Sequence, residues 1–139
     1  MCIRDRRSGL DTPDLVLLGE ATWWLGDSPG SMAVSEEVYQ RLLEAPGGEH
    51  AAADQALRLS LEWFTRGDLQ IGGAWLARAR RLVNDLPTCP LHGRLAYCEA
   101  AGDLTLTGDP APAADAAVLV DELATRFDDP TLRLSLIHI

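Results

Sequence analysis

The sequence predicts an all-α protein in which three antiparallel helical hairpins stack as a right-handed solenoid. Its strongest signal is a Gly-Asp pair that recurs every 41 residues, with its glycine at Gly26, Gly67 and Gly108. Internal repeats of about this length are typical of solenoid proteins. Apolar residues recur at the spacing of one helix face, and no segment alternates with the period of two that marks a half-buried strand. We therefore expect a single repeat array over residues 7–133.

Each Gly-Asp pair is predicted to form the turn inside one hairpin. Glycine readily adopts the left-handed backbone at which many helices end, and the aspartate that follows can cap the free N–H groups of the next helix. Counting outward from the three turns places the hairpins at residues 13–44, 49–84 and 91–126.

The first hairpin is delimited by two pairs in which proline follows a hydroxyl residue. Thr12 precedes Pro13, and Ser28 precedes Pro29. A proline in the first helical turn loses no hydrogen bond, and the hydroxyl before it can cap the helix. These pairs predict helices over residues 13–25 and 29–44.

The second and third hairpins show the helix period most clearly. The helix predicted over residues 49–65 carries the apolar stripe Ala53, Ala56, Leu57, Ser60, Leu61 and Phe64. The helix predicted over residues 69–84 carries the shorter stripe Ala74, Trp75, Ala79, Leu82 and Val83. After a helix over residues 91–106, Asp109-Pro110 starts a helix over residues 111–126 with the stripe Ala113, Ala116, Ala117, Val120, Leu123, Ala124 and Phe127. Asp129-Pro130 is expected to open a seventh helix.

Residues 1–6 and 134–139 are predicted not to belong to the protein. If residues 134–139 are encoded by CTG TCT CTT ATA CAC ATC, the reverse complement encodes Met-Cys-Ile-Arg-Asp, which is how the chain begins. This inverted repeat resembles the mosaic end that transposase-based library preparation leaves on sequencing fragments, and such segments are excluded from fold reasoning. We therefore expect residues 7–133 to be an internal piece of a longer protein.

Composition excludes several classes of function. All 12 basic residues are arginine, and with 21 acidic residues the net charge is −9. Because such a chain repels phosphate, we expect no direct contact between this segment and nucleic acid. No apolar run approaches the roughly 18 residues of a membrane-spanning helix, and three cysteines are too few for a disulfide framework. We expect a cytoplasmic protein from a GC-rich bacterial genome.

The turns share a further pattern that resembles the tetratricopeptide repeat. A bulky residue lies three or four positions before each turn glycine, and a small residue lies five positions after it: Ser31, Gly72 and Ala113. The tetratricopeptide period is usually about 34 residues, and the extra residues fit in the loops between hairpins. A HEAT-like repeat has a closer period of about 40 to 47 residues, but the small residue favours the tetratricopeptide pattern.

Three segments resemble one group of tetratricopeptide proteins more specifically. They are ATWWLG at residues 21–26, AWLARARRL at 74–82 and LPTCPLHG at 86–93. Together they resemble the tetratricopeptide region of bacterial LuxR-type helix-turn-helix transcriptional regulators. The resemblance implies a right-handed tetratricopeptide-like superhelix within a larger regulator whose DNA-binding module lies elsewhere in the chain.

Three motifs that suggest chemistry are better explained as structure. Residues 26–30 match G-x-S-x-G, but a nucleophile elbow needs a strand before its serine, so Ser28 is interpreted as a helix cap. A zinc site built from Cys89, His92 and Cys98 lacks an evident fourth ligand. The arginines of residues 78–81 are expected to form a solvated helix face rather than an anion site. We predict no catalytic residue, metal or cofactor.

The candidate binding residues lie on the first helices of the hairpins, which line the concave groove in tetratricopeptide arrays. Two aromatic side chains beside a carboxylate can hold an apolar group with a cationic neighbour. The candidate contacts are Glu20, Trp23, Trp24, Leu61 and Phe64. The alternative is that Trp23 and Phe64 are core residues packed between hairpins.

These observations predict a non-catalytic module that binds a protein, a peptide or a small effector. The resemblance implies that it belongs to a larger transcriptional regulator and contacts the neighbouring domains of that chain. A scaffold repeat protein without a DNA-binding part is the second hypothesis, and a fragment of a multidomain enzyme is the third.

Overall fold

The computed structural model describes residues 9–138, and over this range it contains helices and no strand. The elements are α1 (Thr12–Trp24), α2 (Ser28–Glu44), α3 (Glu49–Thr65), α4 (Leu69–Asn84), α5 (Pro90–Thr107), α6 (Ala111–Arg126), α7 (Pro130–Leu134) and the 3-10 turn η2 (Ser135–His138). The all-α prediction is confirmed, and every predicted helix end lies within about one residue of the observed one, well inside the usual uncertainty of such boundaries.

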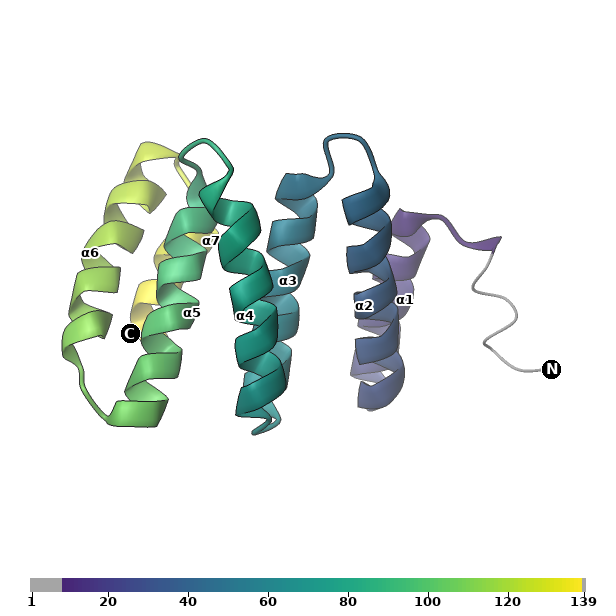
Figure 1. The fold of residues 1–139 in the computed structure, drawn as a ribbon, viewed down its shortest axis with the longest axis horizontal. Coiled ribbons are helices and arrows are strands. Elements are labelled where there is room, and N and C mark those ends of the chain that lie inside the picture. Colours follow the sequence, from purple (N-terminus) through teal and green to yellow (C-terminus); the bar gives the residue numbers. More distant parts are fainter. Residues whose placement is uncertain (1–8, 139) are drawn as a thin grey trace.

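The helices pair as three hairpins, α1 with α2, α3 with α4 and α5 with α6, which stand side by side in Figure 1. Neighbouring hairpins are joined where α2 packs on α3 and where α5 packs on both α3 and α4. The short α7 closes the far end by packing against α6 and α5.

The two ends of the chain were predicted to be foreign sequence. Residues 1–6 lie outside the described residues. In the C-terminal segment, Leu134 ends α7 and Leu136 packs against a small buried cluster formed by Val120, Leu123, Ala124 and Leu132.

A left-handed glycine stands at each hairpin turn, as the Gly-Asp repeat predicts. The φ angles are 80° at Gly26, 83° at Gly67 and 72° at Gly108. A side chain at such a φ angle is strained, because Cβ crowds the carbonyl oxygen that follows. The same backbone reversal therefore recurs once in each repeat.

Aspartate side chains cap most of the helices that follow a turn. Asp27 accepts a hydrogen bond from the backbone N–H of Gly30 at 2.9 Å, and Asp68 accepts one from Ile71 at 3.0 Å. The predicted roles of Thr12 and Ser28 are wrong: both residues are already helical, and Asp11 and Asp27 are the caps. A carboxylate one position earlier replaces the hydroxyl because its oxygen reaches the third N–H of the helix.

The largest core cluster lies between the first and third hairpins and includes the buried stripe of α3. Tyr39 on α2 meets Trp75 on α4 edge to face, with ring centroids 4.9 Å apart. The cluster contains Met32, Tyr39, Ala52, Ala53, Ala56, Leu57, Leu59, Trp75, Leu76, Ala79, Val83, Leu91, Leu95 and Cys98. Since the central hairpin packs against both of its neighbours, this core is continuous across the three hairpins.

The small residues five positions after each turn glycine are all buried. At Gly72 the reason is visible, because a Cβ there would lie 2.5 Å from the Phe64 ring. Because Gly72 has no side chain, the bulky Phe64 ring fits against α4, and α3 and α4 approach closely.

The Phe64–Gly72 contact predicts opposite effects for two neighbouring glycines. Gly72→Ala should lower the free energy of unfolding by about 1–3 kcal/mol, because the Phe64 ring must move. Gly73→Ala is the matched control: a Cβ there meets nothing within 4 Å, so the variant should gain about 0.5–1 kcal/mol from helix propensity. Urea unfolding followed by circular dichroism measures both, and equal stabilities would contradict the close approach.

Candidate functional site

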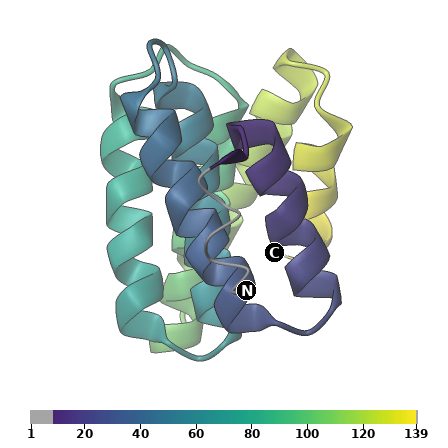
Figure 2. The ribbon, with the colours of Figure 1, turned by 90° about the vertical axis from the view of Figure 1, so that its right-hand side faces the viewer.

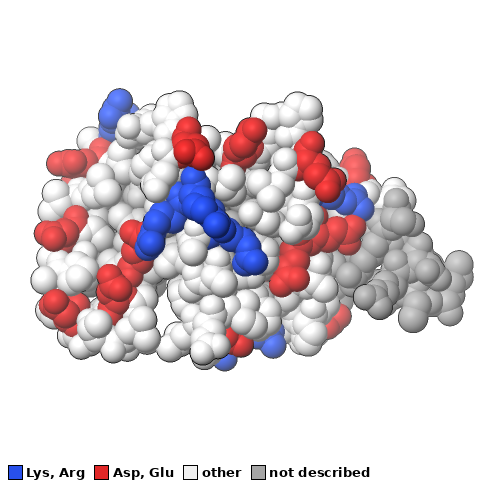
Figure 3. Space-filling view, viewed as in Figure 1, with Lys and Arg blue, Asp and Glu red and all other residues white. Residues whose placement is uncertain are grey.

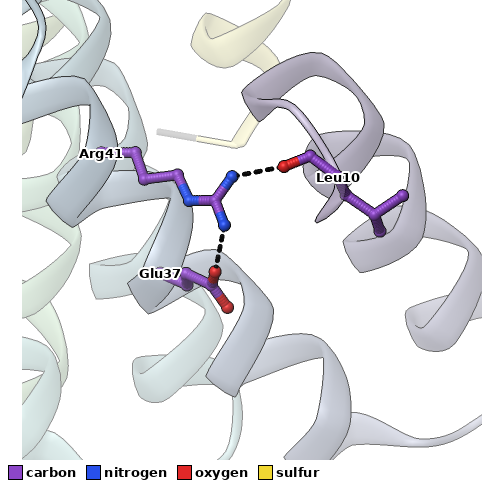
Figure 4. A network of polar contacts seen from close by, with 3 residues as sticks. All are labelled: Leu10, Glu37 and Arg41. Carbon is purple, nitrogen blue, oxygen red and sulfur yellow. Dashed lines mark hydrogen bonds and ion pairs between the residues drawn. The ribbon is translucent and has the colours of Figure 1, made fainter. Parts of the chain in front are cut away.

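Helix α1 lies at one end of the array, where it packs on α2 but makes no comparable contact with α3 (Figure 2). Its start is tied to the end of α2 by Arg41. The guanidinium of Arg41 donates one hydrogen bond to the carbonyl oxygen of Leu10 and another to Glu37, both at 2.6 Å (Figure 4). This contact holds α1 against α2 and leaves its other side open.

A hollow of about 330 Å³ lies between α1, α2 and α3. We call it the α1 hollow. The α1 residues that line it are Leu15, Val16, Gly19, Glu20, Trp23 and Trp24; the α2 residues are Ser31, Val34, Ser35 and Val38; and the α3 residues are Gln55, Arg58 and Glu62.

The floor of the α1 hollow is apolar and fixed. Leu15, Val34 and Val38 form a fully buried cluster there. The Ser31 hydroxyl donates to the carbonyl oxygen of Gly19 at 2.9 Å, so this hydroxyl is used in holding α2 against α1.

The rim of the α1 hollow is aromatic and charged. The side chain of Trp23 is 40% exposed and that of Trp24 is 85% exposed. Glu20 and Arg58 are also exposed. Trp23 is therefore not the inter-hairpin core residue of the alternative hypothesis.

Glu62 has the least ordinary environment in the α1 hollow. One of its carboxylate oxygens, Oε2, is buried without a hydrogen-bond partner among the described residues. Burial raises the pKa of this carboxyl above its usual value, and the positive charge of Arg58 opposes the shift. The sequence analysis did not select Glu62 or Arg58, although Gln55, Arg58 and Glu62 follow the i, i+3, i+7 spacing of one helix face.

The predicted set of five contacts is divided in the structure. Glu20, Trp23 and Trp24 line the α1 hollow together, whereas Leu61 and Phe64 do not. Leu61 and Phe64 pack against the large core cluster, and the Phe64 ring lies against Gly72 of α4. Phe64 also lines a second, smaller hollow of about 210 Å³ between α3, α4 and α5.

The arginines of α4 lie near the centre of the face seen in Figure 3, with acidic side chains on either side. Arg78 lies over the Trp75 ring, 4.5 Å from its centroid. Arg80 forms an ion pair with Glu99 on α5 at 2.6 Å. Arg78 and Arg80 are thus engaged with other side chains, and both Arg80 and Arg81 are exposed.

The two described cysteines are free thiols in different surroundings. Cys89 is the N-cap of α5, and its Sγ lies 3.6 Å from His92 Nδ1. Cys98 is buried, and burial raises the pKa of its thiol to about 12. Among residues 9–138 no group of three or more potential ligands is placed to hold a metal ion.

The chain matches no protein-family model, no curated protein and no solved structure. No described helix has the length and apolar character that crossing a membrane requires.

The half-buried carboxyl of Glu62 predicts a pH-dependent stability. A raised pKa in the folded state means that protonated Glu62 favours folding. This contribution to stability is complete below the pKa of the unfolded state and is lost as the pH rises through the pKa of the folded state. Glu62→Gln removes the ionisable group, so it should raise the urea midpoint at pH 7 and have much less effect at pH 3.5. Glu122→Gln, at an exposed position on α6, is the control and should change neither midpoint. A Glu62→Gln variant less stable than the wild type at pH 7 would contradict the burial.

The two thiols are predicted to differ in reactivity. The thiolate is the attacking species, so iodoacetamide at pH 8 should label Cys89 well before Cys98, as measured by peptide mass spectrometry. In concentrated guanidinium chloride both should react at similar rates. Equal labelling of the folded protein would show that Cys98 is not shielded.

Proposed function

We propose that this chain is a non-catalytic repeat module that binds a ligand in the α1 hollow, as the sensor or interaction region of a larger bacterial transcriptional regulator. The observation that carries the proposal is the pair of exposed indoles, Trp23 and Trp24, beside a hollow with an ordered floor. Aromatic anchors at the edge of a concave surface dominate many binding interfaces.

The repeat architecture supports a binding role rather than catalysis. The hollow lies between two successive hairpins, where solenoid proteins present extended binding surfaces. Its Ser31 hydroxyl already donates to the protein backbone, so that serine is not free to act as a nucleophile. The tetratricopeptide-like superhelix and the LuxR-type parent belong to this proposal and rest on the sequence resemblance.

The parent protein can be tested by sequencing the genomic DNA downstream of the codon for Arg133. A helix-turn-helix domain in the same reading frame supports the regulator. Further repeats that end without such a domain favour a scaffold, and a catalytic domain favours an enzyme.

The binding site can be tested with peptides selected from a displayed random library against the folded chain. Trp24→Ala should weaken binding of a selected peptide by at least about 2 kcal/mol, as truncation of an aromatic hot spot does. The matched control is Leu17→Ala, because Leu17 is an exposed apolar residue of α1 outside the hollow. Isothermal titration calorimetry measures binding, and circular dichroism verifies that both variants stay helical. Unchanged affinity in Trp24→Ala and Trp23→Ala would reject the α1 hollow as the site.

A further inference from the structure

We propose that the α1 hollow binds a primary alkylammonium group, with Glu20 and Glu62 as its anionic partners and Trp23 and Trp24 as its aromatic walls. The inference rests on the proposed binding function and specifies the chemistry of the ligand. It adds Glu62, which only the folded structure brings beside the two indoles.

The charges of the hollow favour a cation. Two carboxylates, Glu20 and Glu62, line it together with one guanidinium, Arg58. Within the described residues none of the three takes part in an ion pair. The whole chain, at −9, adds a long-range attraction for cations and repels anions. The carboxylates of the hollow are therefore available to an incoming positive charge.

The carboxylate of Glu62 has an oxygen that no hydrogen-bond donor of the described residues satisfies. Its Oε2 is buried and unpartnered, but the side chain as a whole is only about half buried and lines the hollow, so rotation about its terminal torsion brings this oxygen to the surface of the hollow. An unsatisfied buried acceptor is costly, and a charged donor offsets that cost most effectively. A primary ammonium has three N–H donors and no acceptor, whereas a quaternary ammonium has no N–H at all.

The remaining surfaces fit the rest of an alkylammonium ligand. A cation within about 6 Å of an indole ring is attracted by the negative face of that ring. Val16, which lines the hollow and is partly exposed, offers contact to a methylene stem above the buried cluster of Leu15, Val34 and Val38. A short amine thus meets an apolar side chain, aromatic walls and a carboxylate within one hollow of about 330 Å³.

The test is an NMR titration of the ¹⁵N-labelled chain with n-butylammonium chloride at fixed ionic strength, following the indole N–H signals. We expect saturable shifts of the Trp23 and Trp24 signals. Two comparison probes separate the contributions: n-butanol has the same stem without the charge, and tetramethylammonium has the charge without N–H groups. Both should bind more weakly than n-butylammonium.

The variant that tests the contact is Glu62→Gln. Loss of a charge-assisted hydrogen bond should weaken n-butylammonium binding by about tenfold or more. Because this variant is expected to be more stable at pH 7 than the wild type, weaker binding does not reflect unfolding. Glu122→Gln is the matched carboxylate control and should leave the affinity unchanged.

The source of the ammonium group is distinguished by a second ligand, the tripeptide Ac-Ala-Lys-Ala-NH₂. Tighter binding of the tripeptide supports a lysine side chain of a partner protein, and tighter binding of n-butylammonium supports a free amine.

If n-butanol or tetramethylammonium binds as tightly as n-butylammonium, the ammonium inference is overturned while the proposed binding function stands. Absence of any shift at the hollow for every probe overturns the inference; failure of the selected peptides to depend on Trp24 overturns the proposed function separately.

Discussion

The close approach of α3 and α4 is the interaction on which the rest of the structure depends. Phe64 lies over Gly72, where even a methyl group would collide with its ring. This contact brings the apolar faces of α3 and α4 into one core with Tyr39 and Leu95 of the flanking hairpins. Since a hairpin cannot bury its face alone, the central hairpin is the surface against which both neighbours fold.

The α1 hollow follows from how the first hairpin meets this central one. The join is made through α2 and α3, and Arg41 ties the start of α1 to α2. Between the third and second hairpins the corresponding first helices, α5 and α3, do pack together, and Arg94 and Asp54 form an ion pair between them. Among the described residues no ion pair joins α1 to α3, and the α1 hollow lies where these two helices face each other.

Glu62 connects the stability of the array with its proposed function. A carboxylate that is buried without a partner opposes folding, and residues that contribute to function at a cost in stability are common at binding sites. A ligand that donates to Glu62 relieves the same cost that the free protein carries.

The sequence by itself determined the helices, their pairing and their turns. The hairpin turns could be predicted because a left-handed glycine followed by an aspartate is a local requirement, met at Gly26, Gly67 and Gly108. Helix caps were harder to predict, because aspartate and hydroxyl residues stand at adjacent positions. The caps are Asp11 and Asp27 and not Thr12 and Ser28. Glu20, Trp23 and Trp24 could be placed on one helix face from spacing alone.

Only the tertiary structure decided which face of α3 meets α1. The repeat puts Phe64 where Trp23 lies in the first hairpin, which suggested one shared groove. Instead Phe64 packs over Gly72, and Arg58 and Glu62 line the hollow beside the indoles. Helical periodicity groups residues into faces, but the partner of each face depends on how hairpins pack, and that is settled by contacts between residues far apart in the chain.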